Sequence, residues 1–79
     1  MDLISACAEL AAKAGEAYHD ALHTLPPIRE RSEQQQMTLN ALQDAQRRAA
    51  EAWRSAKLAD PDWSPTKVYP TPMDYRSAA

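Results

Sequence analysis

Hydrophobic and polar residues alternate with a helical period through residues 2–24, in the first proline-free stretch of the chain. Apolar or small residues recur at spacings of four and three, which is the pattern of a helix that packs along one seam. This seam consists of Ile4, Ala8, Ala11, Gly15, Tyr18, Leu22 and Leu25. The pattern therefore predicts an amphipathic helix over 2–24.

A second apolar row runs beside this seam and widens the apolar face of the helix. It consists of Leu3, Cys7, Leu10, Ala14, Ala17 and Ala21. Two adjacent rows are wider than one partner helix can cover, and their small residues would let a second backbone approach closely. We therefore expect more than one helix to pack against this segment.

The proline pair Pro26 and Pro27 separates the first helix from a second proline-free stretch that ends at Asp60, before Pro61. Proline is well tolerated at the first helical position, so we expect a helix over 27–59 that begins at Pro27. Its seam consists of Ile28, Leu39, Leu42, Ala49, Trp53 and Ala56, and Ser32, Gln35 and Gln46 interrupt it. A short turn between two helices makes them antiparallel. The fold class expected is all-α, an antiparallel two-helix hairpin.

The last twenty residues cannot form a regular helix, because four prolines recur every few residues from Pro61 onwards. Proline at this spacing favours an extended backbone. Three of the five aromatic residues of the chain nevertheless lie here, at Trp63, Tyr69 and Tyr75. We therefore divide the chain into a helical hairpin, 1–59, and an extended Pro-rich C-terminal strap, 60–79, which lies either on its own bundle or on a partner.

A hairpin of this length buries too little apolar surface to be stable alone, since small domains usually need disulfides, metals or oligomerisation. The 79 residues include a single cysteine, so a disulfide framework is excluded. We therefore expect a homodimer that forms a four-helix bundle, with Gln35 and Gln46 either fixing the register or partly exposed. The alternative is a monomer whose tail folds back over the hairpin. The residues predicted at the dimer interface are Ile4, Ala11, Gly15, Tyr18 and Leu22.

Composition and motifs argue against an enzyme. The one glycine excludes phosphate-binding loops and dinucleotide folds, which need several. Glu16, His19 and His23 have metal-like spacing but lie on the polar face of the first helix, and Cys7 lies on its apolar face without a basic neighbour. No set of acid, base and nucleophile converges, so we expect no catalytic residue, no metal and no cofactor.

A basic stripe near the end of the second helix, which includes Arg47, Arg48, Arg54 and Lys57, supports a nucleic-acid alternative. A small hairpin dimer with a basic face resembles, in outline, the RNA-binding hairpin dimers encoded by plasmids. Cations near a helix C-terminus also stabilise the helix dipole, and the formal net charge of the chain is −2. Binding of RNA or DNA through the stripe from Arg47 to Arg54 is therefore the second hypothesis.

The aromatic residues of the strap favour a protein-binding module, because Tyr and Trp anchor many protein interfaces. We expect a small regulator or inhibitor that docks on a larger protein and blocks or reshapes a site, encoded by a phage or another mobile element. Neither a membrane span nor a signal peptide is evident, so we expect a cytoplasmic protein without a membrane partner. The predicted partner-binding residues are Trp63, Tyr69, Met73, Tyr75, Arg47 and Arg54.

Overall fold

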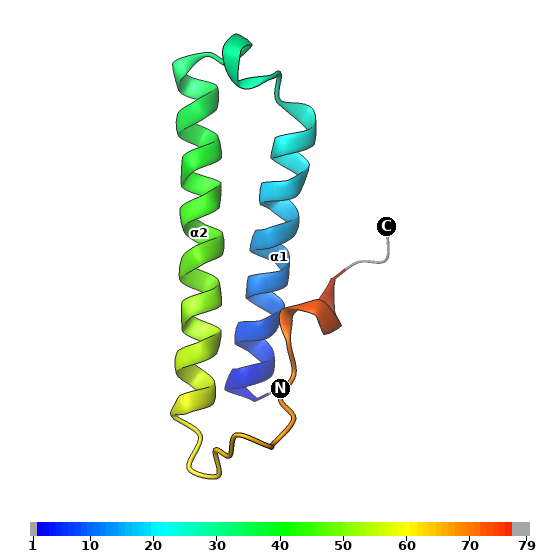
Figure 1. The fold of residues 1–79 in the computed structure, drawn as a ribbon, viewed down its shortest axis with the longest axis vertical. Helices are drawn as coiled ribbons and strands as arrows, with labels where there is room; N and C mark the ends of the chain where they lie inside the picture. The colour runs from blue at the N-terminus through cyan, green and yellow to red at the C-terminus, as the bar shows by residue number, and fades with distance from the viewer. Residues whose placement is uncertain (1, 77–79) are drawn as a thin grey trace.

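Two antiparallel helices and a strap that returns along them make up the computed structural model, which describes residues 2–76 (Figure 1). Helix α1 spans Leu3–Thr24 and helix α2 spans Glu33–Leu58, with a short 3₁₀ turn, η1, at Ile28–Glu30 between them. A second 3₁₀ turn, η2 at Pro72–Tyr75, ends the strap. The predicted all-α hairpin is confirmed. Met1 and residues 77–79, which the predicted hairpin and strap include, lie outside the described residues.

Helix α1 begins where the sequence pattern predicts, because Asp2 caps it. The Asp2 carboxylate accepts a hydrogen bond of 2.7 Å from the backbone N–H of Ser5, a donor that has no partner inside the helix. Leu25 ends the helix with an extended backbone, as expected for a residue before Pro26.

Helix α2 begins at Glu33, six residues later than the predicted start at Pro27. The physical reason is a capping box at Ser32, whose side chain accepts from the N–H of Gln35 while the Gln35 side chain accepts from the N–H of Ser32. Two otherwise unpaired donors are satisfied there, which no residue near Pro27 can do. Ile28, predicted to lie in the seam, is instead 72% exposed.

The connection between the helices is held by Arg31. Its Nε atom donates a hydrogen bond of 2.9 Å to the carbonyl of Pro26, and its guanidinium also donates to the side chain of Gln36. The guanidinium therefore links the residues after α1 to the first turn of α2. This connection stands where the sequence predicted the start of a continuous second helix.

Small residues form the core between the helices. The buried apolar residues among those described are Ala8, Ala11, Ala12, Leu39 and Ala56, and Gly15 is buried beside them. A Cβ atom at Gly15 would lie 3.3 Å from the Nε2 atom of Gln46, so the two predicted seams meet at this level. Close approach of the two backbones follows from the absence of larger side chains at these positions.

The strap folds back onto its own hairpin. The indole N–H of Trp53 donates a hydrogen bond of 2.8 Å to the carbonyl of Pro70, and η2 then packs against α1 (Figure 1). Thr71 and Asp74 cap η2 reciprocally, as Ser32 and Gln35 cap α2. Of the two positions considered for the strap, the structure has it on its own bundle.

We predict that Gly15→Leu destabilises the hairpin itself. A branched side chain at this position must displace Gln46 from a contact that is already tight for one carbon, which costs about 1–3 kcal/mol of unfolding free energy. Chemical denaturation followed by circular dichroism measures the change. Lys13→Leu, at an exposed position of the same helix, is the matched control and should change stability by less than about 0.5 kcal/mol. Equal stability of the Gly15→Leu variant and wild type would contradict the tight contact.

Candidate functional site

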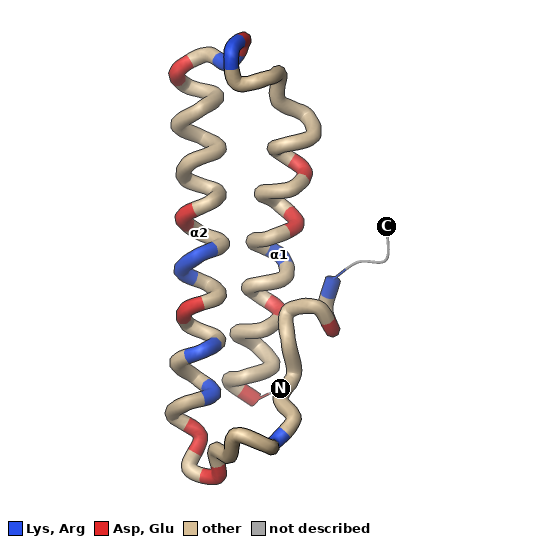
Figure 2. The backbone as a smooth tube through the Cα atoms, viewed as in Figure 1, with Lys and Arg blue, Asp and Glu red and all other residues tan. Residues whose placement is uncertain are grey.

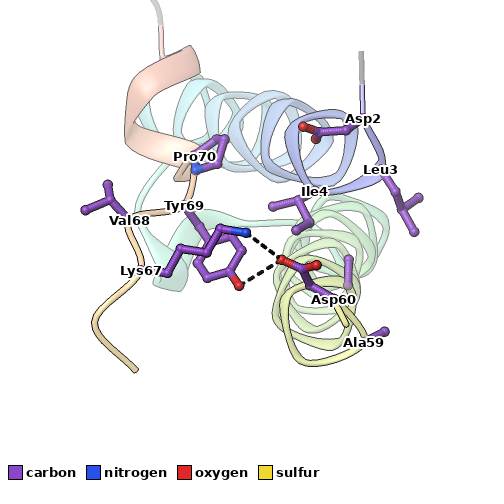
Figure 3. A pocket seen from close by; sticks show the side chains of 10 residues that line it. Asp2, Leu3, Ile4, Ala59, Asp60, Lys67, Val68, Tyr69 and Pro70 are labelled. Atoms are coloured by element: carbon purple, nitrogen blue, oxygen red, sulfur yellow. Dashed lines mark hydrogen bonds and ion pairs between the residues drawn. The ribbon is translucent and has the colours of Figure 1, made fainter. Parts of the chain in front are cut away.

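Asp60 organises the open end of the hairpin, where α2 ends and the strap begins. One oxygen of its carboxylate accepts from the backbone N–H of Asp62 at 3.1 Å. The other accepts from the Lys67 ammonium at 3.0 Å and from the Tyr69 hydroxyl at 2.9 Å (Figure 3). The Lys67 ammonium also lies 5.1 Å from the centroid of the Tyr69 ring. We call Asp60, Lys67 and Tyr69 the clasp, because they fasten the strap to the end of α2.

The electrostatics of the clasp favour its charged form at neutral pH. The N–H of Asp62, followed by Lys67 and Tyr69, lowers the pKa of the Asp60 carboxyl below its ordinary value. The hydrogen bond to Asp60 raises the pKa of the Lys67 ammonium. Burial, and then the hydrogen bond to Asp60, raises the pKa of the Tyr69 hydroxyl. Each group therefore holds its usual protonation state more firmly than it would in an unfolded chain.

A cleft of about 530 Å³ lies beside the clasp, between the start of α1, the end of α2 and the strap (Figure 3). Its apolar lining is Leu3, Ile4, Ala56, Ala59, Val68 and Pro70. Its polar lining is Asp2 and the clasp, and these groups already bond to one another or, for Asp2, to the N–H of Ser5. The cleft therefore resembles a docking surface for a side chain more than a reaction centre.

The strap exposes its large apolar side chains to solvent. Val68 is 92% exposed, Met73 70% and Trp63 44%, whereas Tyr69 and Tyr75 are half-buried. The predicted anchors thus divide into two groups. Tyr69 holds the strap in place through the clasp, and Trp63 and Met73 remain accessible together with Val68, which the sequence analysis did not select.

The basic stripe on α2 is partly neutralised within its own helix. Arg47 and Arg48 both form ion pairs with Asp44, and the Lys57 ammonium lies 3.8 Å from the centroid of the Trp53 ring. Figure 2 shows that acidic residues interrupt the basic ones along this helix. Arg54 is exposed. The stripe therefore has a weaker positive field than its four cations suggest.

The residues predicted at a dimer interface do not form one exposed surface. Ala11 is 6% exposed, and Gly15 is buried against Gln46, so the hairpin itself covers both. Ile4, Tyr18 and Leu22 are half-buried along the same seam. A second copy could reach Ala11 or Gly15 only if α1 and α2 separated.

The residues with metal-like spacing remain on the surface of α1. His19 and His23 are exposed, and the rings of Tyr18 and His19 meet edge-on with centroids 6.1 Å apart. Within residues 2–76, no group of three or more His, Cys, Asp or Glu side chains is arranged to hold a metal ion. Cys7 is a free thiol of intermediate exposure.

Neither helix of this part of the chain has the length and apolar character that a membrane crossing requires.

Comparisons with protein-family models, with curated proteins and with solved structures gave no match.

The clasp was missed at the sequence level because Asp60 was interpreted only as the end of a helix. A signal for it exists in the Asp60-Pro61-Asp62 sequence, since an aspartate side chain commonly accepts from the N–H two residues later in a turn. Nothing in the sequence pattern indicates that Lys67 and Tyr69 return to the same carboxylate.

We predict that acid releases the strap. The pKa of Asp60 is lowered in the folded state, so its contribution to stability is complete above the ordinary value of 3.8 and is lost as the pH falls through the lower, folded value. The NMR resonance of the Trp53 indole N–H, which donates to Pro70, should shift in this acid range.

The Asp60→Asn variant should show no such acid-dependent step, and its strap should already be loosened at pH 7. Asp62→Asn is the control, because the Asp62 backbone N–H that bonds to Asp60 is retained. An unchanged acid step in the Asp60→Asn variant would show that the clasp does not hold the strap.

Proposed function

We propose that this protein is a non-enzymatic protein-binding module, a small regulator or inhibitor that docks on a larger protein through its strap. One observation carries the proposal. Two polar groups of the strap, on Lys67 and Tyr69, bond to Asp60, whereas the apolar side chains of Val68 and Met73 between and beyond them are largely exposed to solvent. A segment that served only to cover the bundle would have the opposite arrangement.

Order in the strap supports binding because it lowers the entropy lost on docking. The clasp fixes the strap near its start, the bond from Trp53 to Pro70 fixes its middle, and the capped turn η2 fixes its end. Four prolines restrict the backbone between these points. Val68 and Met73 are thus presented on a backbone that is already shaped, which is the arrangement that gives affinity from few contacts.

The partner surface that suits this strap is a shallow apolar groove with a polar rim. Val68, Met73 and Trp63 would enter the groove. Binding of this kind can block a site without any chemistry by the module. We place the activity in the cytoplasm, where the free thiol of Cys7 would stay reduced.

Binding of RNA or DNA through the α2 stripe is the alternative. Exposed Arg54 supports it, whereas the pairing of Arg47 and Arg48 with Asp44 reduces the charge available to phosphate groups. The tests of the two hypotheses are independent, because they use different residues.

We predict that the exposed strap residues carry the affinity for the partner. Photo-crosslinking from the strap in a lysate of the native host identifies the bound protein, and calorimetry with that purified protein measures the affinity. Trp63→Ala and Met73→Ser should each weaken binding, by about 2 kcal/mol or more for a true anchor. Their folding should be unaffected, since both side chains are exposed.

Ile28→Ser is the matched control for this experiment. Ile28 is as exposed as Met73 but lies in η1, at the end of the hairpin away from the clasp. The affinity of this variant should equal that of wild type. Loss of binding in the control but not in the strap variants would show that the partner binds elsewhere than on the strap.

We also predict no measurable binding of random DNA or RNA at near-physiological salt, because acidic neighbours dilute the stripe. Fluorescence anisotropy with labelled oligonucleotides over a range of salt concentrations checks this. A sub-micromolar complex that weakens steeply with salt, and that is lost in an Arg47→Gln and Arg54→Gln double variant, would establish the alternative.

A further inference from the structure

The side of the hairpin opposite the strap is apolar and uncovered. On α1 it consists of Leu3, Cys7, Leu10, Ala14 and Ala17, and on α2 it consists of Ala41, Ala45, Ala52 and the capping residue Ala59. Leu3 is 68% exposed and Leu10 61%. We call these nine residues the open face.

The register of the hairpin places the two rows on one side. Gly15 lies opposite Gln46, and positions on the two helices then pair with a nearly constant sum because the helices are antiparallel. By this register Leu3 lies level with Ala59, Leu10 with Ala52 and Ala17 with Ala45. Figure 3 shows Leu3 and Ala59 on the same side of the helix pair, away from Val68 and Lys67 of the strap.

We propose that the open face binds a second copy of this chain, in a symmetric dimer whose twofold axis runs parallel to the helices. Such an axis sets α1 of one copy on α2 of the other and makes the contact self-complementary. The four helices then form a bundle in which every neighbour is antiparallel.

Side-chain sizes across this contact are complementary. Large residues of the open face lie on α1, at Leu3 and Leu10, and α2 presents alanines at the same levels, at Ala59 and Ala52. The twofold axis brings each leucine of one copy against the alanine row of the other, where there is room for it. Contact of this kind between large and small residues gives close packing without voids.

The exposed area of the chain matches the area that a dimer contact requires. The chain exposes 5838 Å². A folded monomer of 8.8 kDa is expected to expose about 4,800 Å². The excess of roughly 1,000 Å² is close to the ~800 Å² that each partner buries in a stable interface.

Charge does not oppose the contact. The charged side chains between these rows are Lys13 of α1, which is paired with Glu9, and Arg48 of α2, which is paired with Asp44. The acidic residues Glu9 and Asp20 of α1 lie outside these rows. The low charge of the face lets two copies approach without burying an unpaired ion.

This interface differs from the one predicted from the seam of α1, which the hairpin uses internally. It leaves Val68 of the strap uncovered, because Val68 points away from Leu3 and Ala59 (Figure 3), although these two residues also line the cleft beside the clasp. The dimer therefore does not depend on the strap's role in binding, and the two can fail separately.

Light scattering coupled to size-exclusion chromatography tests the dimer with the full chain. Wild type should have twice the 8.8 kDa chain mass at micromolar concentration. Leu10→Glu should raise the dimer dissociation constant by at least about 100-fold, because it buries two unpaired carboxylates. Ile28→Glu is the matched control, since Ile28 is 72% exposed but lies in η1, outside both helices. Circular dichroism confirms that both variants remain helical.

A monomeric wild type, a dimer that survives Leu10→Glu or a dimer that Ile28→Glu also dissociates would each overturn the proposal. Crosslinking tests the orientation of the two copies. Ser55→Cys places a thiol level with Cys7 of the second copy, so mild oxidation should give a covalent dimer on non-reducing gels. Asp44→Cys, at a position off the open face, should not, and a crosslink there instead would overturn the proposed axis.

Discussion

The close contact between two helices with small interface residues is the constraint on which the rest of this structure depends. Ala8, Ala11 and Gly15 fill the α1 side of the contact, and the side chains of Gln46 and Arg76 lie against Gly15. Apolar burial stabilises by about 25 cal/mol per Å², so alanines contribute little each and must be packed without gaps. This requirement leaves the hairpin narrow, at 49 × 24 × 20 Å overall.

A narrow hairpin cannot bury its longer side chains, and the strap depends on this fact. Trp53 lies in the α2 seam, but its indole N–H extends to the strap and bonds to Pro70. Asp60, the next seam position after Ala56, accepts from Lys67 and Tyr69. The last seam positions of α2 therefore hold the strap instead of packing against α1, and the polar clasp closes an end of the bundle that lacks large apolar residues.

The sequence pattern predicted the helices because helical periodicity is a local property of the sequence. Most buried residues lie in the two predicted seams, whereas the fully buried Ala12 lies outside them. The pattern misplaced the start of α2, since a proline and a capping box both mark helix starts and only the box at Ser32 satisfies two N–H groups. The clasp could not be predicted from this pattern. Which carboxylate Lys67 and Tyr69 share is decided by the path of a non-helical segment, for which no periodicity exists.

Large apolar side chains of this chain are distributed in a way that a stable monomer would not favour. Leu39 is the one leucine, isoleucine or methionine that is buried within residues 2–76, while Leu10, Met37 and Met73 are all more than half exposed. Domains of this size gain only a few kcal/mol from a single core. Contacts beyond the single chain would therefore add substantially to its stability.

The two exposed apolar surfaces lie on opposite sides of the helix pair, which has a consequence for binding. A dimer through the open face would carry two straps, one on each outer side of the bundle, with their clasps at the same end. A partner with two equivalent grooves would then bind both straps, and the second contact would form at a high effective concentration. Weak affinity of one short strap would be sufficient for a stable complex with such a partner, so the small core and the exposed strap fit a single mode of action.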